Sequence, residues 1–165
     1  MRVYESLARS FLALLLVGLA GGTADAHPLG EPPGRLYQVE GRAMHLYCRG
    51  SGAPTVVFDA GLGGTSLEWD ATVERVAAFT EACVFDRSGY GWSDSRRQPR
   101  TSPREARELH TLLAAAGKQG PFVLVGHSFG GLNAQCFARN FPTDVAGLVL
   151  VDASHPEQIE RSLAP

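Results

Sequence analysis

Four short runs of apolar residues most constrain how this chain folds. They lie at residues 55–58, 83–85, 122–125 and 147–151. A short run that is apolar at nearly every position is typical of a strand buried on both faces, as in a parallel sheet. Helical patterns separate the runs, at residues 65–77, 102–116 and 129–139. This alternation predicts an α/β fold, with a mostly parallel sheet and helices on both faces.

A hairpin is expected before these strand and helix units. Residues 35–40 and 42–49 alternate between apolar and polar side chains on either side of Gly41. Such alternation is typical of half-buried antiparallel strands, and glycine suits the tight turn between them. The N-terminal hairpin brings the expected sheet to six strands. Residues 27–34 are rich in proline and glycine and predict an extended lead-in.

Two of the expected helices begin with capping signals. The segments Thr65–Glu68 and Ser102–Glu105 both match Ser/Thr-x-x-Glu, in which the first side chain caps the helix. Pro103 follows Ser102, and proline is favoured at the first helical position. We therefore expect Thr65 and Ser102 to be the N-cap residues.

Residues 1–26 have the features of a secretory signal peptide. Arg2 and Arg9 are basic, residues 11–20 are apolar, and Ala24–Ala26 fits the small-residue rule for cleavage. The apolar run has about ten residues, whereas a membrane span needs roughly 20. We expect cleavage after Ala26, a secreted or periplasmic domain of residues 27–165, and no stable membrane span after cleavage. An uncleaved N-terminal anchor is the alternative.

Three cysteines, Cys48, Cys83 and Cys136, limit the disulfide chemistry. An odd number cannot pair completely within one chain, which excludes a dense disulfide framework. Export permits a single Cys48–Cys83 bridge, and buried free cysteines are the alternative. No spacing of histidine, cysteine or carboxylate residues fits a metal site, so we expect no metal.

Charge and glycine spacing argue against two functional classes. With 15 basic and 17 acidic residues, the net charge is -2, which does not favour nucleic acid as a partner. Gly61, Gly63 and Gly64 lack the spacing of a phosphate-binding or dinucleotide loop, so we expect no cofactor. A group of arginines near Glu105 and Glu108 is expected to form a solvated face. Its members are Arg96, Arg97, Arg100, Arg104 and Arg107.

The segment from Gly126 to Gly130 reads Gly-His-Ser-Phe-Gly and matches G-x-S-x-G. It follows an expected buried strand and precedes an expected helix, which is the setting of a nucleophile elbow. The turn from strand to helix is so sharp that Ser128 must adopt strained dihedral angles, and its neighbours Gly126 and Gly130 must be small. Ser128 is therefore the candidate nucleophile. A glycine and serine turn without chemistry is the alternative.

Three segments together give a specific resemblance to a known family. They are Asp59–Gly64, Phe85–Asp94 and Gly126–Gly131. On these residues the chain, from about Arg35 to Gln158, resembles the α/β-hydrolase fold in its esterase, lipase and epoxide-hydrolase-like branch. The resemblance implies an oxyanion hole formed by the backbone N–H groups of Leu62 and Phe129. Residues 86–87 and 92–94 are expected to brace the loop after the fourth strand.

A serine at the elbow, in place of the aspartate of dehalogenases and epoxide hydrolases, implies hydrolytic acyl transfer. The expected substrate is a small acyl compound with an ester, thioester, amide or lactone bond, cleaved through an acyl-enzyme on Ser128. In this fold the acid and then the histidine follow the serine. Only 37 residues follow Ser128, so we expect a fold truncated after about the sixth strand.

The histidines present are poorly placed to act as the base. His127 is expected to point away from Ser128 and to order the loop, and His155 follows the sixth strand. Asp152 stands where a minority of family members carry the acid, and loop capping is its alternative role. We therefore expect little or no turnover from this chain alone. A non-catalytic relic that binds a ligand or partner, and half of a split enzyme whose second polypeptide completes the sheet, are the alternatives.

Overall fold

The structure is a computed structural model that describes residues 28–97, 99–155 and 157–158. The expected signal peptide, residues 1–26, lies outside the described residues. Within the described part, no helix is both long enough and apolar enough to cross a membrane.

In the part of the chain that the structure describes, six strands form one mixed sheet in the order β1-β2-β4-β3-β5-β6. They are β1 (Arg35–Val39), β2 (Arg42–Arg49), β3 (Val56–Asp59), β4 (Ala82–Phe85), β5 (Phe122–His127) and β6 (Val145–Val151). The first two form an antiparallel hairpin, and β2 also pairs antiparallel with β4. The pairs β3–β4, β3–β5 and β5–β6 are parallel. The expected N-terminal hairpin and the mostly parallel sheet are confirmed.

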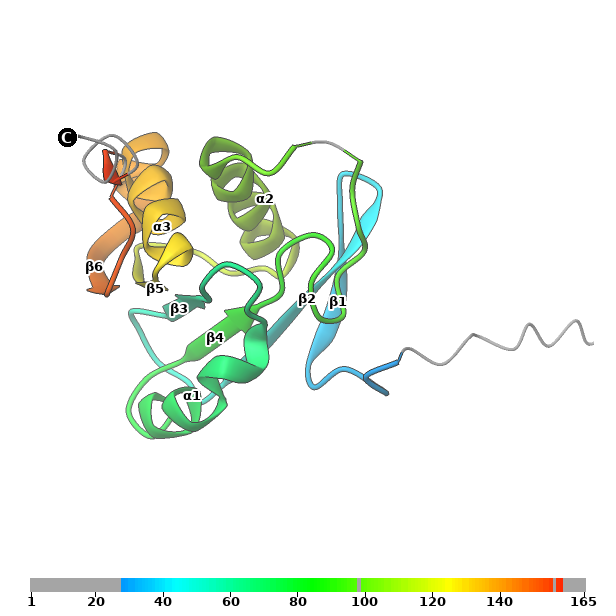
Figure 1. Cartoon of the computed structure of the whole chain (residues 1–165). Coiled ribbons are helices and arrows are strands. Elements are labelled where there is room, and N and C mark those ends of the chain that lie inside the picture. Colours follow the sequence, from blue (N-terminus) through cyan, green and yellow to red (C-terminus); the bar gives the residue numbers. More distant parts are fainter. Residues whose placement is uncertain (1–27, 98, 156, 159–165) are drawn as a thin grey trace, which may run out of the picture.

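Helices cover both faces of this sheet, as expected (Figure 1). On one face, α2 (Ser102–Ala115) and α3 (Phe129–Asn140) pack over the larger core, in which Leu112 and Phe137 are fully buried. On the other face, η1 (Ser66–Trp69) and α1 (Asp70–Val76) lie over a smaller core around Phe58 and Val73. A short turn, η2 (Pro142–Asp144), leads into β6. Burial on both faces explains why the central strands read as apolar runs.

Of the two predicted N-cap residues, Thr65 does occupy the N-cap position of η1, whereas Ser102 is not the N-cap of α2. Thr65 precedes a 3-10 turn, and its side chain makes no capping hydrogen bond; instead the Glu68 N–H donates to the Thr65 carbonyl. The second helix has Thr101 as its N-cap, so Ser102 is already helical. At both sites backbone carbonyls accept the first N–H groups, and the side-chain capping box does not form.

The hairpin is tied to the sheet by a covalent bond. Glu40 and Gly41 both have positive φ and form its two-residue turn. Cys48 in β2 lies opposite Cys83 in β4, and the two residues form a disulfide. Of the two arrangements that the sequence left open, the structure therefore has the single bridge. Cys136 is free.

Loss of this bridge is expected to lower the free energy of unfolding. The bond closes a loop with a sequence separation of 35 residues, for which loop-closure entropy gives about 3–4 kcal/mol. Cys48→Ser should reduce stability by about this amount in urea unfolding followed by circular dichroism. Cys136→Ser is the matched control and should change it by less than about 1 kcal/mol. Equal losses in the two variants would contradict the assignment.

The two edges of the described sheet differ in character. At one edge, β1 carries polar residues between its apolar ones. At the other edge, residues 148–151 of β6 are exposed although all four are apolar. Successive residues of a strand face opposite sides of the sheet, so both faces of β6 are open to solvent. An apolar edge with unpaired backbone groups is a template for another strand.

Candidate active site

Ser128 stands at a sharp turn between β5 and α3. Its backbone dihedrals are φ 51° and ψ −117°, outside the regions that residues other than glycine normally occupy. The predicted strained conformation of Ser128 is thus confirmed. The residue is half-buried, and its hydroxyl has no hydrogen-bond partner among the described residues.

The two elbow glycines are required by backbone contacts. A Cβ on Gly126 would lie 2.5 Å from both the carbonyl oxygen of Gly130 and the Cα of Gly131. A Cβ on Gly130 would lie 2.3 Å from the Asp59 carbonyl oxygen and 2.6 Å from that of Ala60. Because these are main-chain atoms, no side-chain rotation can relieve the overlap. The elbow is therefore packed directly against the end of β3.

The glycine-rich loop after β3 runs beside the elbow. A Cβ on Gly61 would lie 3.0 Å from Nδ1 of His127 and 3.6 Å from the Cβ of Ser128. The Gly64 N–H closes a tight turn by donating to the Gly61 carbonyl at 3.1 Å. Leu62, at the tip of this turn, is 72% exposed. The His127 ring thus packs on the loop, in line with the ordering role expected for it.

The two expected oxyanion donors come from the start of α3 and from the glycine-rich loop that runs beside the elbow. The first N–H groups of an α-helix have no intrahelical acceptor, and Phe129 opens α3. Neither its N–H nor that of Leu62 donates to a described residue. The N-terminus of α3 also carries partial positive charge that favours an anion. The arrangement offers two free donors, whose role in catalysis remains a prediction.

A buried ion pair lies beneath the loop. Arg87, which follows β4 and is 2% exposed, binds the Asp59 carboxylate at the end of β3. The Asn133 amide donates to the other carboxylate oxygen of Asp59 at 3.2 Å. Burial raises the pKa of Asp59 more than Arg87 and Asn133 lower it. The pair joins the ends of β3 and β4 to α3 under the elbow.

The side chains considered as acid and base make no hydrogen bond to Ser128 among the described residues. Asp152 directly follows β6 and has φ 43°, and its carboxylate has no hydrogen bond or ion pair with another described residue. The loop-capping alternative for Asp152 is therefore not seen. His155 is exposed, and its Nδ1 accepts the Glu157 N–H at 3.2 Å. The backbone of this segment does meet the elbow, because the Ser154 N–H donates to the Ser128 carbonyl at 3.0 Å.

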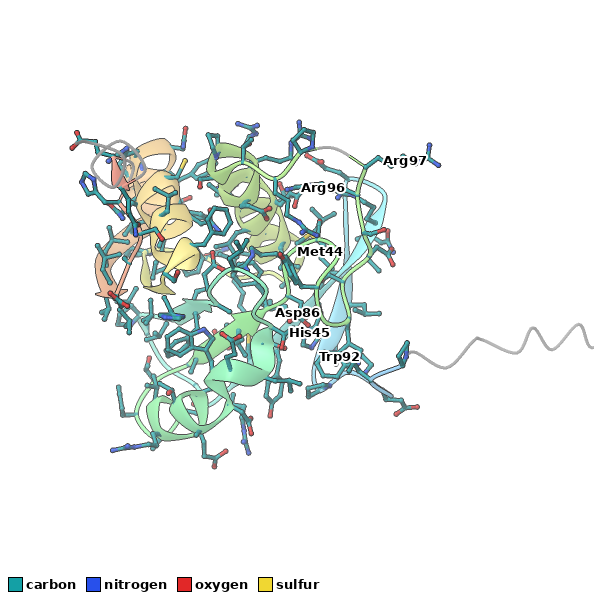
Figure 2. The ribbon with its side chains drawn as sticks, viewed as in Figure 1. Met44, His45, Asp86, Trp92, Arg96 and Arg97 are labelled. Carbon is teal, nitrogen blue, oxygen red and sulfur yellow. A yellow bond between two sulfur atoms is a disulfide. The ribbon has the colours of Figure 1, made fainter. Side chains whose placement is uncertain are left out.

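A buried histidine–aspartate pair exists elsewhere in the fold. His45 of β2 and Asp86, which follows β4, are both fully buried, with Nδ1 and Oδ2 2.8 Å apart (Figure 2). The Nε2 of His45 lies 2.5 Å from the Pro33 carbonyl oxygen. Each ring nitrogen of His45 therefore faces an oxygen atom. Sequence reasoning missed this pair, because only the β2–β4 pairing brings the two residues together.

Asp86 holds together the loop that follows β4. Besides His45 it accepts the backbone N–H groups of Ser66 at 2.7 Å and Trp92 at 3.1 Å. Burial raises the pKa of Asp86, but these hydrogen bonds outweigh it and leave the pKa below its usual value. The Ser93 hydroxyl donates to the Asp86 carbonyl. The bracing role expected for residues 86–87 and 92–94 matches these contacts.

The expectation of a solvated arginine face is wrong for Arg96. Its side chain is 4% exposed and pairs with Glu105 and Glu108 of α2. Glu108 also binds Arg42 of β2 at 2.9 Å. Glu105 and Glu108 are three residues apart, so they share the helix face that meets the sheet. Figure 2 shows Arg96 directed inward and Arg97 directed away from the body.

One group of described residues has the composition of a metal site. Cys48, Glu81 and Cys83 place their ligand atoms within 4.8 Å of one another. The disulfide joins the two sulfur atoms, so they cannot act as thiolate ligands. Glu81 is also bound to Lys118 and to the Thr55 hydroxyl.

The fold and the elbow agree with comparisons to known proteins. A family model described as alpha/beta hydrolase fold matches residues 54–164. The chain belongs to this family. The family resemblance drawn from the three sequence segments is thereby confirmed, and the β1–β2 hairpin lies before the matched region.

Relatives in the family are longer than this chain. YqjL of Bacillus subtilis is 34% identical over 119 residues, covering 72% of this chain and 47% of YqjL. RutD of Azorhizobium caulinodans, named for carbamate hydrolysis, is 32% identical over 109 residues, covering 66% of this chain and 40% of RutD. A thermophilic esterase from Thermogutta terrifontis superposes with a TM-score of 0.66 at 27% identity. The superposition covers 76% of this chain and 49% of the esterase. The chain thus spans less than half the length of these relatives.

Proposed function

We propose that this protein is a serine hydrolase that works through an acyl-enzyme on Ser128. The strained backbone of Ser128, at φ 51° between β5 and α3, is the observation that carries the proposal. Such strain persists only where the surroundings enforce it, and it is common at active sites. Here the close packing of Gly126 and Gly130 enforces it.

In the proposed reaction the Ser128 oxygen attacks the acyl carbon and its proton passes to a base. The carbonyl oxygen of the substrate becomes an oxyanion, which accepts the N–H groups of Leu62 and Phe129. Collapse expels the protonated leaving group and leaves the acyl ester on Ser128. Water then attacks this ester, the acid is released, and Ser128 regains its proton.

The proposed substrate is a small acyl compound with an ester, thioester, amide or lactone bond. Attack by a serine on any of these bonds forms an acyl ester on the serine. Water can cleave that ester by the same addition and elimination, so one mechanism serves all four bond types. The names of two relatives, one for carbamate hydrolysis and one for esterase activity, support carbonyl chemistry of this kind.

We further propose that Ser128 depends on groups outside the described residues for its activation. Its hydroxyl has no partner there, and neither Asp152 nor His155 hydrogen-bonds to it. The open apolar edge of β6 favours completion by a further strand, from a second polypeptide or from chain beyond the described part. The Cys48–Cys83 disulfide favours an oxidising compartment, which supports secretion or a periplasmic location.

A fluorophosphonate probe tests the proposal, because it labels only an activated serine. With imidazole supplied as an external base, the chain should be labelled, and tryptic mass spectrometry should place the adduct on Ser128. Ser128→Ala should abolish labelling, whereas the control Ser95→Ala, in the exposed loop before α2, should retain it. Without imidazole the labelling should be much slower, because the activating groups lie outside the described residues. Absence of label under both conditions would support the alternative, a non-catalytic relic that binds a ligand.

A further inference from the structure

Arg87 makes contacts that a structural ion pair does not need. Besides the Asp59 carboxylate, its Nη1 donates to the Ala60 carbonyl oxygen at 2.6 Å. Its Nη2 donates to the Gly61 carbonyl oxygen at 2.5 Å. One buried guanidinium group therefore holds three consecutive residues where β3 becomes the glycine-rich loop.

The bond to Gly61 fixes a direction as well as a position. A peptide unit is planar and trans, so the carbonyl of Gly61 and the N–H of Leu62 lie in one plane and point in opposite directions. While Arg87 holds the carbonyl oxygen, the Leu62 N–H must point away from Arg87. The Gly64 N–H donates to the same carbonyl and resists rotation of the plane. Donation to the carbonyl also polarises the peptide and strengthens its N–H as a donor.

Arg87 also contacts the second expected donor residue. Its guanidinium carbon lies 5.7 Å from the centre of the Phe129 ring and 5.2 Å from that of Tyr90. These distances are within the range of cation–π attraction. The same side chain thus touches the loop that presents Leu62 and the residue that opens α3.

We propose that Arg87 is the positioning residue of the oxyanion hole and sets the direction of the Leu62 N–H. This inference rests on the proposed function and assigns a role to a residue that touches no substrate. A guanidinium group suits the role, because its planar fork can bind two carbonyl oxygens and a carboxylate at once. A lysine at position 87 would retain the charge but not this fork.

The test compares Arg87→Lys with Arg96→Lys. Arg96 is the matched control, since it is a second buried arginine that pairs with carboxylates but makes no bond to the loop. Both variants keep the charge opposite their buried acids, which favours folding. Hydrogen exchange of the amides at 60–64 measures how firmly the loop is held. The rate at which a p-nitrophenyl phosphonate phosphonylates Ser128, with imidazole present, measures how well the oxyanion hole works.

Arg87→Lys should accelerate exchange at residues 60–64 and leave the β4 and β5 amides unchanged. It should lower the maximal rate of phosphonylation by about 10²-fold, the loss typical of one oxyanion donor, with little change in probe binding. Arg96→Lys should change neither measurement. Unchanged loop exchange in Arg87→Lys, or a loosened loop with an unchanged maximal rate, would overturn the proposal. A wild-type chain that resists phosphonylation contradicts the proposed function, and the exchange measurement then still decides whether Arg87 orients the loop.

Discussion

Gly130→Ala should leave the chain unable to form its native elbow. The added methyl group would lie 2.3 Å from the Asp59 carbonyl oxygen, so either the end of β3 or the start of α3 must move. Overpacking against side chains costs about 1–3 kcal/mol, and contact with fixed backbone costs more. We expect a loss of at least about 3 kcal/mol in the free energy of unfolding, which is a large part of the stability of a small domain.

Urea unfolding of Gly130→Ala and Gly126→Ala, followed by circular dichroism, measures this loss. The matched control is Gly147→Ala in β6, where a Cβ meets nothing within 4 Å. Gly147 also has no positive φ, so its substitution by alanine carries no backbone strain. The control should unfold within about 1 kcal/mol of the wild type. If Gly130→Ala and Gly147→Ala unfold at the same urea concentration, the elbow is less closely packed than described.

Asp86→Ala should be the most damaging substitution of a charged residue. It leaves buried His45 without its carboxylate and also removes the acceptor for the N–H groups of Ser66 and Trp92. Removal of one partner from a buried charged pair costs about 3–5 kcal/mol. Thermal unfolding at neutral pH should show this loss. Asp144→Ala is the control, since Asp144 pairs with His110 at the surface and such pairs contribute at most about 1 kcal/mol.

The pH dependence of stability gives a second test of Asp86. Its pKa is lower in the folded protein than in the unfolded chain, so its contribution is complete above the unfolded value of about 3.9. The contribution is lost as the pH falls through the folded pKa. The difference in stability between wild type and Asp86→Ala should therefore shrink on acidification below about pH 4. A difference that stays constant down to the acid transition would contradict the lowered pKa of Asp86.

The strands and helices were largely predictable because local patterns determine them. Strands covered on both faces read as apolar runs, and the elbow of Ser128 depends on five consecutive residues. The helix starts were less predictable, because Thr65 precedes a 3-10 turn without capping it through its side chain, and Thr101 takes the place expected for Ser102. Both differences reflect backbone carbonyls that accept the N–H groups which a side chain was expected to cap.

The polar networks were not predictable, because they join residues from distant segments. His45 meets Asp86 only through the antiparallel pairing of β2 with β4, which no local pattern indicates. Arg96 was expected in solvent, but the glutamates of α2 face the sheet and require cations there. Arg87 was expected only to brace its own loop. Its bonds to Ala60 and Gly61 follow from the parallel pairing that brings β3 and β4 to one end of the sheet.

The hydrogen bonds between the elbow and the end of β6 make Ser128 sensitive to events at the sheet edge. The Ser128 N–H donates to the Val151 carbonyl at 3.2 Å, and the Ser154 N–H donates back to the Ser128 carbonyl. The exposed strand is thus linked to the nucleophile through main-chain atoms alone. A strand bound along β6 would stabilise one conformation of Val151, and through it one conformation of Ser128. We therefore expect occupancy of the edge to alter the conformation of Ser128, and a ligand bound at the elbow to alter the affinity of the edge for a strand by the same factor.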